Sequence, residues 1–294
     1  MASKTEKKEF TKVGKYVYDP SAEPLGSGTF GTVFKGAELA NKHNRVAIKI
    51  INRNTRKSFE ALFKEYEKEI KNLKRIKGKN LLEYKHSYAT TDGDLYIITK
   101  FYKDGNLSDY MDRAGGKLPL ATALKILKLI AQTFCCLETL SMPGKKDAEV
   151  MMHRDIKPDN ILMEGDEPIL ADFGLTKFIP KEDRMKLMEH TAQVGTPSYM
   201  SPQILGDERY SYKCDIWSMG VVTYEMIFGI DRRPWMGRSK FDLEKNIREK
   251  PLVFPEDIPT DAQDLLKRML AIDENHRLDW EGVLYHSALQ QISI

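Results

Sequence analysis

The chain has 294 residues, of which 41% are hydrophobic and 30% charged, and its formal net charge is +3. This is the composition of an ordinary globular protein, which excludes a disordered or fibrous chain, and the length fits either one large domain or two lobes. The positive charge is small and dispersed, and its densest run, "KRIKGK", follows a helical pattern without interleaved aromatic residues, which argues against nucleic-acid binding.

The three cysteines, Cys135, Cys136 and Cys214, have the spacing of neither a zinc site nor a secreted disulfide framework. A reducing compartment, the cytoplasm or the nucleus, is the expected location. No stretch is read as the roughly 20 apolar residues of a bilayer span, and no signal peptide is read, so no integral membrane segment is expected. Residues 1–15 are predicted to be a flexible basic leader.

Residues 16–102 predict an N-terminal lobe of short strands around one helix. "RVAIKI", at 45–50, alternates β-branched residues around Lys49 as a strand does, and "LYIITKFY" repeats the signal. Between them, residues 59–76 change to a period of three to four, which predicts an amphipathic helix. Its apolar stripe consists of Leu62, Tyr66, Ile70 and Leu73.

Residues 103–294 predict a larger, mainly helical C-terminal lobe after a hinge at about 100–104. Helical patterns lie at 107–114, 121–140 and 211–229. The predicted fold class is therefore α+β, with a strand-rich first lobe and a helical second lobe.

A glycine-rich stretch, "LGSGTFGTVF", carries Gly26, Gly28 and Gly31. Without side chains at these positions a backbone hairpin can approach phosphate oxygens, although a single glycine-rich turn is more often only a turn. A dinucleotide-binding fold would need these glycines to open a helix, whereas "TVFKGAEL" after them predicts a second strand. That alternative is rejected.

Three further motifs carry charged and polar groups. "VAIK" ends in Lys49, and Glu69 follows 20 residues later on the predicted helix; either residue alone would usually be a solvated surface charge. "HRDIKPDN" sets Asp155, Lys157 and Asn160 between apolar flanks, and "LADFGL" places Asp172 after an apolar strand. Carboxylate and amide oxygens suit Mg²⁺, which takes its remaining ligands from phosphates and water.

In this order and spacing the four motifs resemble those of eukaryotic protein kinases, from Tyr16 to the C-terminus. The resemblance implies the bilobal kinase fold and transfer of the γ-phosphoryl group of ATP to a protein hydroxyl. It implies that Asp155 is the catalytic base and that Lys157 neutralises the transferring group. Lys49 would hold the α- and β-phosphates and pair with Glu69.

The same resemblance assigns the ATP and metal ligands. The residues that it assigns to ATP binding are Leu25, Gly26, Ser27, Gly28, Gly31, Val33, Ala47, Lys49, Thr99, Lys100, Tyr102, Asn160, Leu162 and Asp172. Asn160 and Asp172 would hold Mg²⁺, and the backbones of Lys100 and Tyr102 would bind adenine. A second apolar stack is implied for Leu73, Tyr84, His153 and Phe173.

Lys157 and "GTPSYMSP" resemble the serine/threonine branch of the family. "VGKYVYDPSAEPLGSGTFGTVFKGAE" and "RLDWEGVLYHSAL" are similar to the autophagy-initiating kinases, with the calcium/calmodulin-type kinases as the second choice. The expected partners are ATP and a protein carrying Ser or Thr. The competing reading is a pseudokinase scaffold, but such proteins lose catalytic residues that this chain keeps.

The sequence also suggests a regulatory loop, and it departs from the family pattern at one position. Residues 172–203 resemble an activation loop, and Thr191 is the candidate phosphosite for an upstream kinase or for trans-autophosphorylation; the alternative is an unmodified polar loop residue. Gln203 stands where the family has a glutamate that pairs with an arginine, here Arg277. The loss of charge predicts about 1 to 2 kcal/mol of lost stability, so that Gln203→Glu would raise the melting temperature. Asp215 is expected to tie a central helix to the catalytic loop.

Overall fold

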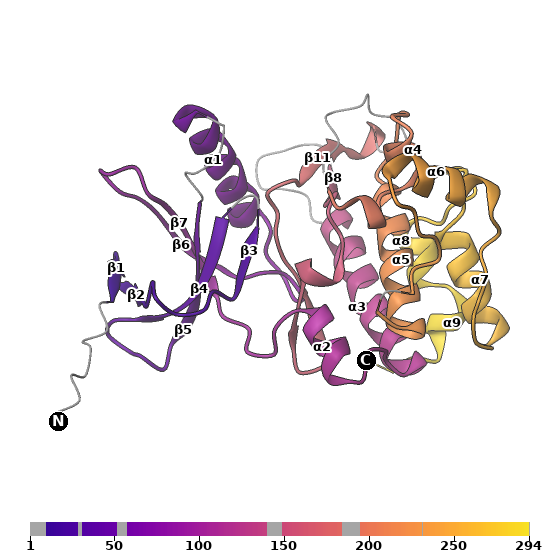
Figure 1. Cartoon of the computed structure of the whole chain (residues 1–294), viewed down its shortest axis with the longest axis horizontal. Coiled ribbons are helices and arrows are strands. Elements are labelled where there is room, and N and C mark those ends of the chain that lie inside the picture. The colour runs from indigo at the N-terminus through magenta and orange to yellow at the C-terminus, as the bar shows by residue number, and fades with distance from the viewer. Residues whose placement is uncertain are drawn as a thin grey trace. The chain divides into compact units, whose positions relative to one another are not determined.

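The computed structural model describes residues 10–28, 31–51, 58–139, 149–183, 195–230 and 232–293. The chain divides into two compact units, the first made of Met1–Lys77 and Leu82–Tyr102 and the second of Gly78–Leu81 and Lys103–Ile294. The first unit is a sheet with one helix and the second is mainly helical (Figure 1). The predicted α+β class is confirmed.

The first unit is built on one antiparallel sheet in the order β1-β2-β4-β5-β7-β6, with β3 paired to β4. Its strands are β1 (Thr11–Val13), β2 (Tyr16–Tyr18), β3 (Gly26–Gly28), β4 (Gly31–Glu38), β5 (Arg45–Ile50), β6 (Tyr84–Ala89) and β7 (Leu95–Lys100). The predicted strands at 45–50 and after the glycines are present as β5 and β4. In register, Val33 lies opposite Lys49, and Ala47 lies opposite Thr99.

Helix α1 (Phe59–Arg75) carries the predicted amphipathic stripe, since Leu62, Tyr66, Ile70 and Leu73 are all buried. Ser58 caps the helix, its side chain accepting from the Ala61 amide at 3.3 Å. Glu60 in the first turn and the basic last turn complement the helix dipole. The helix therefore begins and ends where local signals place it, and its buried face also includes Glu69.

The predicted leader ends earlier than expected, because residues 11–13 form β1. This strand pairs with β2 through a turn at Gly14, whose φ is +57°, and Val13 is only 3% exposed. Lys15 pairs with Glu38 at 2.8 Å. The prediction of a flexible leader is wrong for 11–15, since burial of Val13 and Tyr16 in the sheet core offsets the entropy of ordering the segment.

The second unit contains eight helices within the described residues. They are α2 (Leu107–Arg113), α3 (Leu120–Thr139), α4 (Pro202–Leu205), α5 (Cys214–Phe228), α6 (Lys240–Glu249), α7 (Thr260–Met269), α8 (Trp280–Leu284) and α9 (Ser287–Gln290). Two antiparallel strand pairs accompany them: β8 (Glu149–Met152) with β11 (Lys177–Pro180), and β9 (Ile161–Glu164) with β10 (Glu167–Leu170). Short 3₁₀ turns lie at Pro158–Asn160, Lys181–Asp183 and Pro197–Tyr199.

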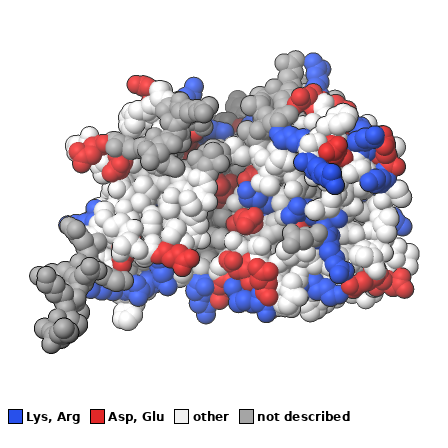
Figure 2. Space-filling view, viewed as in Figure 1, with Lys and Arg blue, Asp and Glu red and all other residues white. Residues whose placement is uncertain are grey.

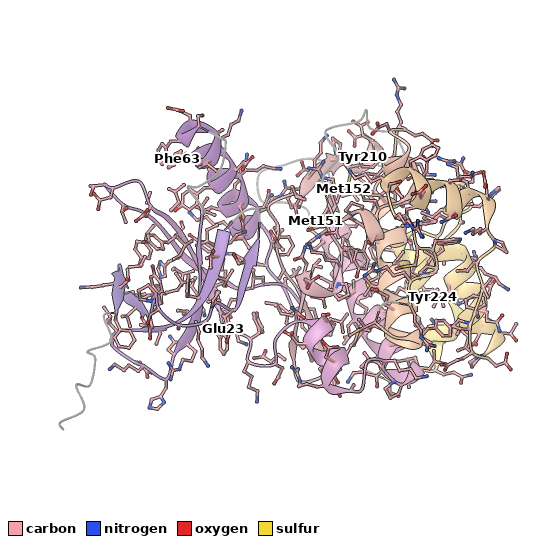
Figure 3. The ribbon with its side chains drawn as sticks, viewed as in Figure 1. Glu23, Phe63, Met151, Met152, Tyr210 and Tyr224 are labelled. Atoms are coloured by element: carbon pink, nitrogen blue, oxygen red, sulfur yellow. The ribbon has the colours of Figure 1, made fainter. Side chains whose placement is uncertain are left out.

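Helix α5 is buried along almost its whole length and forms the centre of this unit. Its Trp217 stacks on Trp235 with ring centroids 5.6 Å apart and planes 12° apart. Met151 and Met152 of β8 lie in the same unit and are 2% and 0% exposed (Figure 3). Because both faces of this helix are covered, its apolar residues show no single stripe.

Helix α3 corrects one expectation. Leu120–Glu138 is long and apolar enough to cross a bilayer by length and composition, whereas no such stretch was expected from the sequence. Half of that window is buried inside the protein. Phe134, for example, stacks on Trp280 at 4.2 Å. A core helix has the same composition as a membrane span, so composition by itself does not distinguish the two.

The turn at Gly14 generates a stability prediction. A Cβ there would lie 2.2 Å from the Tyr88 ring, and a side chain at positive φ costs roughly 1–2 kcal/mol in addition. Gly115 has a similar φ of +88° but nothing within 4 Å. We expect Gly14→Ala to lower the thermal unfolding midpoint clearly more than Gly115→Ala does, as measured by circular dichroism. Equal losses would show that the hairpin does not depend on this contact.

Candidate active site

In the first unit, Lys49 on β5 and Glu69 on α1 form an ion pair. Lys49 Nζ lies 2.7 Å from Glu69 Oε1, and the two side chains are 17% and 8% exposed. Lys49 is opposite Ile97 in the register of β7, so it projects from the middle of the sheet. A half-buried cation held by a buried carboxylate is a preorganised site for an anion.

The glycine hairpin lies beside this pair in the same sheet. Gly26 is opposite Val33, and Gly28 is opposite Gly31. Gly31 needs to be glycine for reasons internal to the protein, because its φ is +152° and an added Cβ would lie 2.2 Å from the Ile50 carbonyl oxygen. At Gly26 and Gly28 an added Cβ would meet no atom of the described residues within 4 Å. Open space at these two positions fits a ligand that approaches the backbone.

The residues predicted to contact adenine are divided between the units. Ala47 and Thr99 are paired across β5 and β7, and Thr99 is 8% exposed. The Lys100 amide donates to the Glu83 carbonyl at 2.9 Å, so this amide is already used within the sheet. Leu162 belongs to β9 of the second unit and pairs with Asn106. Leu25, just before the hairpin, and Ser27, within it, are exposed, and Tyr102 is buried.

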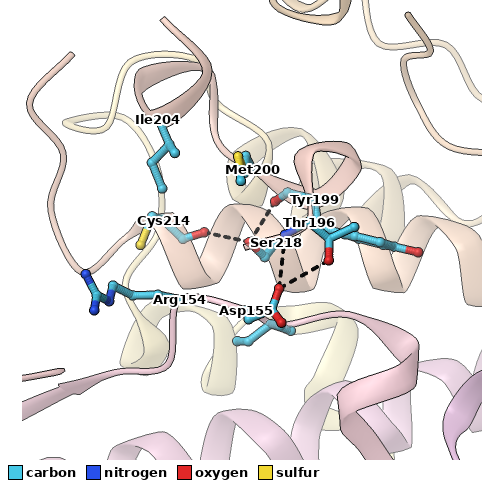
Figure 4. Close-up of a pocket in the computed structure, with 9 residues that line it drawn as sticks. Arg154, Asp155, Thr196, Tyr199, Met200, Ile204, Cys214 and Ser218 are labelled. Carbon is cyan, nitrogen blue, oxygen red and sulfur yellow. Dashed lines mark hydrogen bonds between the residues drawn. The ribbon is translucent and has the colours of Figure 1, made fainter. Parts of the chain in front are cut away.

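In the second unit, Asp155 is held by both of its carboxylate oxygens, and Figure 4 shows the two bonds to Thr196. Oδ1 accepts the Thr196 amide at 3.0 Å and the Thr196 hydroxyl at 3.3 Å. Oδ2 accepts Asn160 Nδ2 at 2.9 Å and lies 3.3 Å from Lys157 Nζ. Lys157 also donates to the Thr196 hydroxyl at 2.8 Å. The predicted run "HRDIKPDN" therefore does bring its acid, lysine and amide together.

Asn160 and Asp172 are the predicted metal ligands. Asn160 uses its Nδ2 for the carbonyl and carboxylate of Asp155, which turns its Oδ1 to the other side. Asp172 has a φ of +60° and lies two residues after the end of β10. Among the described residues no three His, Cys, Asp or Glu side chains group as a metal site. An amide oxygen and one carboxylate fit Mg²⁺, which completes its shell with phosphate and water oxygens.

The catalytic run is fastened to α5 by Asp215. Its carboxylate accepts the His153 amide at 2.6 Å and the Arg154 amide at 2.8 Å. Burial raises the pKa of Asp215, and His153 together with these two amides opposes that rise. Arg154 has a φ of +69°, a conformation that non-glycine residues rarely adopt. The predicted role of Asp215 is confirmed, and the strain at Arg154 is held by these bonds.

The four residues of the predicted apolar stack are divided between the two units. Leu73 and Tyr84 belong to the first unit. In the second unit Phe173 is fully buried and contacts His153, with ring centroids 5.3 Å apart and planes 67° apart. His153 Nε2 also lies 2.9 Å from the Ala171 carbonyl. This places the segment that carries Asp172 against the segment that carries Asp155.

Thr196 and its neighbours were not among the predicted site residues. The segment after Gly195 is held by α5: Tyr199 donates its hydroxyl to Glu225 at 2.8 Å, and Ser218 donates to the Tyr199 carbonyl at 2.7 Å (Figure 4). Arg233 pairs with the same Glu225 at 2.7 Å. Burial raises the pKa of Tyr199 and keeps its hydroxyl protonated as the donor. "GTPSYMSP" was the available sequence signal, but it showed nothing of these contacts.

Gln203 contacts Arg277 as predicted, with Nη2 3.0 Å from its Oε1. The structure also shows what the sequence did not, since Glu274 lies 3.4 Å from the same guanidinium and is itself buried. Burial lowers the pKa of Arg277 to about 10, which leaves it charged at neutral pH. Gln203 also donates to the Ile272 carbonyl at 2.6 Å. The counter-charge is therefore supplied by Glu274, and the expectation that Gln203→Glu is stabilising is revised.

Thr191 lies outside the described residues. Arg154, the predicted receiver of its phosphate, donates Nε to the Leu175 carbonyl at 2.8 Å and lines a small pocket with Cys214 and Ile204 (Figure 4).

Comparison with known proteins gives a family match over residues 20–289, to the protein kinase domain. Myosin light chain kinase A of Dictyostelium discoideum is 32% identical over 280 residues, which cover 91% of this chain and 86% of that protein. Serine/threonine-protein kinase atg1 of the same organism is 32% identical over 286 residues, covering 95% and 40%. Serine/threonine-protein kinase ULK3 of Rattus norvegicus is 29% identical over 272 residues, covering 90% and 53%. The chain thus spans about half or less of the latter two.

The buried Arg277 cluster yields a paired prediction. Glu274→Gln leaves a buried cation without a carboxylate, which we expect to cost about 2–4 kcal/mol, somewhat less than a fully broken buried pair because an amide oxygen remains. Gln203→Glu places a second acid on the same arginine and removes the donor to Ile272, so its melting temperature should not rise. Differential scanning calorimetry of both variants measures this. A higher melting temperature of Gln203→Glu together with an unchanged one of Glu274→Gln would show that position 203, and not Glu274, is where Arg277 needs its counter-charge.

Proposed function

This chain belongs to the protein kinase family and is an ATP-dependent serine/threonine kinase, and we propose how its own residues share the reaction. The observation that carries the proposal is the carboxylate of Asp155, held on one oxygen by Thr196 and on the other by Asn160 and Lys157. The bilobal kinase fold, predicted from the four motifs, is confirmed by the family match and by the two units.

The first unit supplies the residues for the phosphates. Lys49 would hold the α- and β-phosphates, and Glu69 keeps its ammonium group in position at 2.7 Å. The backbone of the glycine hairpin would donate N–H groups to phosphate oxygens, for which the open space at Gly26 and Gly28 leaves room. Val33 and Ala47 of the same unit would contact the adenine ring.

The second unit supplies the chemistry at the acceptor. Asp155 accepts the proton of the substrate hydroxyl as that oxygen bonds to the γ-phosphorus and the bond to the β-phosphate oxygen breaks, leaving ADP. Lys157 stabilises the negative charge of the transferring group, and its second bond, to Thr196, holds it beside Asp155. The Thr196 contact also links Asp155 to the segment over which a substrate would lie.

A divalent metal belongs to this chemistry in the family, and we propose Mg²⁺ held by Asn160 and Asp172. When bound, it would neutralise phosphate charge. Asn160 would serve two purposes, since its Nδ2 donates to Asp155 and its Oδ1 would bind the metal. The pseudokinase alternative is not favoured, because the catalytic residues are present. Lys49 is paired with Glu69, and Asp155 accepts a hydrogen bond from Asn160.

The cellular setting is a further proposal. Similarity to atg1 and ULK3 supports membership of the autophagy-initiating group, and similarity to myosin light chain kinase A keeps the calcium/calmodulin-type group as the alternative. A cytoplasmic or nuclear location and a protein partner carrying Ser or Thr accord with such a role. An upstream kinase, or trans-autophosphorylation, would supply a phosphate at Thr191.

The activity is tested with Mg-ATP and a generic Ser/Thr protein substrate. Asp155→Asn removes the proton acceptor and should lower kcat by about 10²-fold or more. Lys49→Met should also reduce transfer, although it lies in the other unit, because it acts on the phosphates. Phosphoamino-acid analysis should give phosphoserine and phosphothreonine. Undiminished transfer by Asp155→Asn would remove that residue from its role, and dominant phosphotyrosine would contradict the serine/threonine assignment.

The regulatory proposal is tested at Thr191. A phosphate there would pair with Arg154 through charge-assisted hydrogen bonds. We expect Thr191→Ala to lower kcat/KM and Thr191→Glu to restore part of it, as measured with enzyme treated with phosphatase or with ATP. If phosphatase-treated Thr191→Ala were as active as the ATP-treated native enzyme, the regulatory proposal would be wrong. The catalytic assignment would be unaffected.

A further inference from the structure

Helix α6 and the loop before it, residues 232–250, form a basic surface that the proposed function does not use; we call it the α6 surface. It contains seven Lys or Arg and three Asp or Glu, so its formal net charge is +4, against +3 for the whole chain. Figure 2 shows Lys and Arg side chains gathered over the part of the second unit where α4 and α6 lie in Figure 1. Part of this charge is paired with acids outside the segment, since Arg233 pairs with Glu225 and Arg248 with Glu208.

Two large apolar side chains stand on this basic surface. Phe241 is 72% exposed, the highest value among the exposed large apolar residues that the structure describes, and Met236 is 53% exposed. Single exposed apolar residues are normal on a protein surface. Two within six residues, set among cations, have the composition of a contact site, in which aromatic, Met and Arg side chains are enriched.

The α6 surface is held rigidly. Asn246 Nδ2 donates to the Met236 carbonyl at 2.6 Å, and Ser239 caps α6 by accepting the Asp242 amide at 3.1 Å. Gly237 is pressed against Leu243, where an added Cβ would lie 2.3 Å from the backbone nitrogen. The loop therefore has one conformation fixed by the helix that follows it, and a partner would pay little to order it.

The charges on the outer face are only partly neutralised. Arg248 pairs with Glu244 at 2.9 Å and also with Glu208. Arg238 and Lys245, in contrast, make no ion pair with any residue in the described part of the chain. Lys245 follows Phe241 by four residues and so shares its face of α6. The opposite face of α6 packs against the protein through the buried Leu243 and Ile247.

We propose that the α6 surface docks an acidic segment of a protein substrate, one that carries an aromatic or branched apolar side chain remote from its phospho-acceptor. Phe241 and Met236 would contact the apolar side chain, and Arg238 and Lys245 would pair with the carboxylates. This rests on the proposed function, since the partner is the kinase's own substrate. Docking raises the effective concentration of the acceptor at Asp155 without any new contact at the catalytic residues.

Binding is measured first, by fluorescence anisotropy with a labelled short peptide in which Asp and Glu flank two Phe. Phe241→Ala and Lys245→Glu should each raise Kd by about tenfold, equivalent to about 1.4 kcal/mol, and added salt should weaken binding to the native chain. Two exposed positions elsewhere serve as matched controls, Tyr285→Ala for apolar area and Lys42→Glu for net charge. Equal Kd values for Phe241→Ala and Tyr285→Ala would overturn the proposal.

Catalysis is measured next, with a Ser peptide alone and with the same peptide joined to the acidic segment by a Gly/Ser linker. The joined peptide should have a KM about tenfold lower on the native chain, and Phe241→Ala should abolish that gain while kcat and KM for the Ser peptide alone stay unchanged. Preference for anionic phosphatidylserine vesicles over the acidic peptide would overturn the proposal in favour of a lipid surface. Failure to phosphorylate the Ser peptide at all would count against the proposed function, whereas the anisotropy result would still decide on docking.

Discussion

The carboxylate of Asp215 is the interaction on which the chemistry of the second unit depends. It is 1% exposed, and it accepts the consecutive amides of His153 and Arg154. A buried carboxylate needs such donors, and a residue at positive φ needs an external restraint. The two amides satisfy the carboxylate, and the carboxylate in turn restrains Arg154. The backbone just before Asp155 is therefore fixed by α5, which is buried along almost its whole length.

The same helix also fixes the segment after Gly195 and the segment around Arg277. Glu225 accepts from Tyr199, and Lys213, just before α5, donates to the Glu274 and Arg277 carbonyls at 3.0 and 2.7 Å. Helix α5 therefore fixes three segments that lie far apart in the sequence: those around Asp155, after Gly195 and around Arg277. Buried charges in this unit are paired or hydrogen-bonded, as they must be in a low-dielectric interior. The catalytic geometry and the stability of the unit therefore share the same contacts.

Much of the fold and of the site was predictable because the signals are local. Helix α1 was predicted from the period of Leu62, Tyr66 and Ile70, and β5 from the alternation around Lys49. The grouping of Asp155 with Asn160 could be predicted because they are separated by only five residues. The strand at Thr11–Val13 was missed, because three residues give no periodicity and their order depends on burial of Val13 against residues elsewhere in the sheet.

The sequence by itself determined the element types and the order of the motifs, since these depend on residue spacing and side-chain chemistry, and its resemblance to protein kinases implied the role of each catalytic group. The resemblance implied the Lys49–Glu69 and Gln203–Arg277 pairs, and only the tertiary structure decided how the other buried polar groups satisfy one another. Gln203 contacts Arg277 across 74 residues of chain because packing brings distant segments together, whereas Glu274, which supplies the carboxylate, lies only three residues before Arg277. Likewise Thr196 meets Asp155 across 41 residues of chain, and no local pattern encodes that contact. Long-range pairing of buried polar groups is a property of the packed core, because only packing removes the water that would otherwise satisfy them.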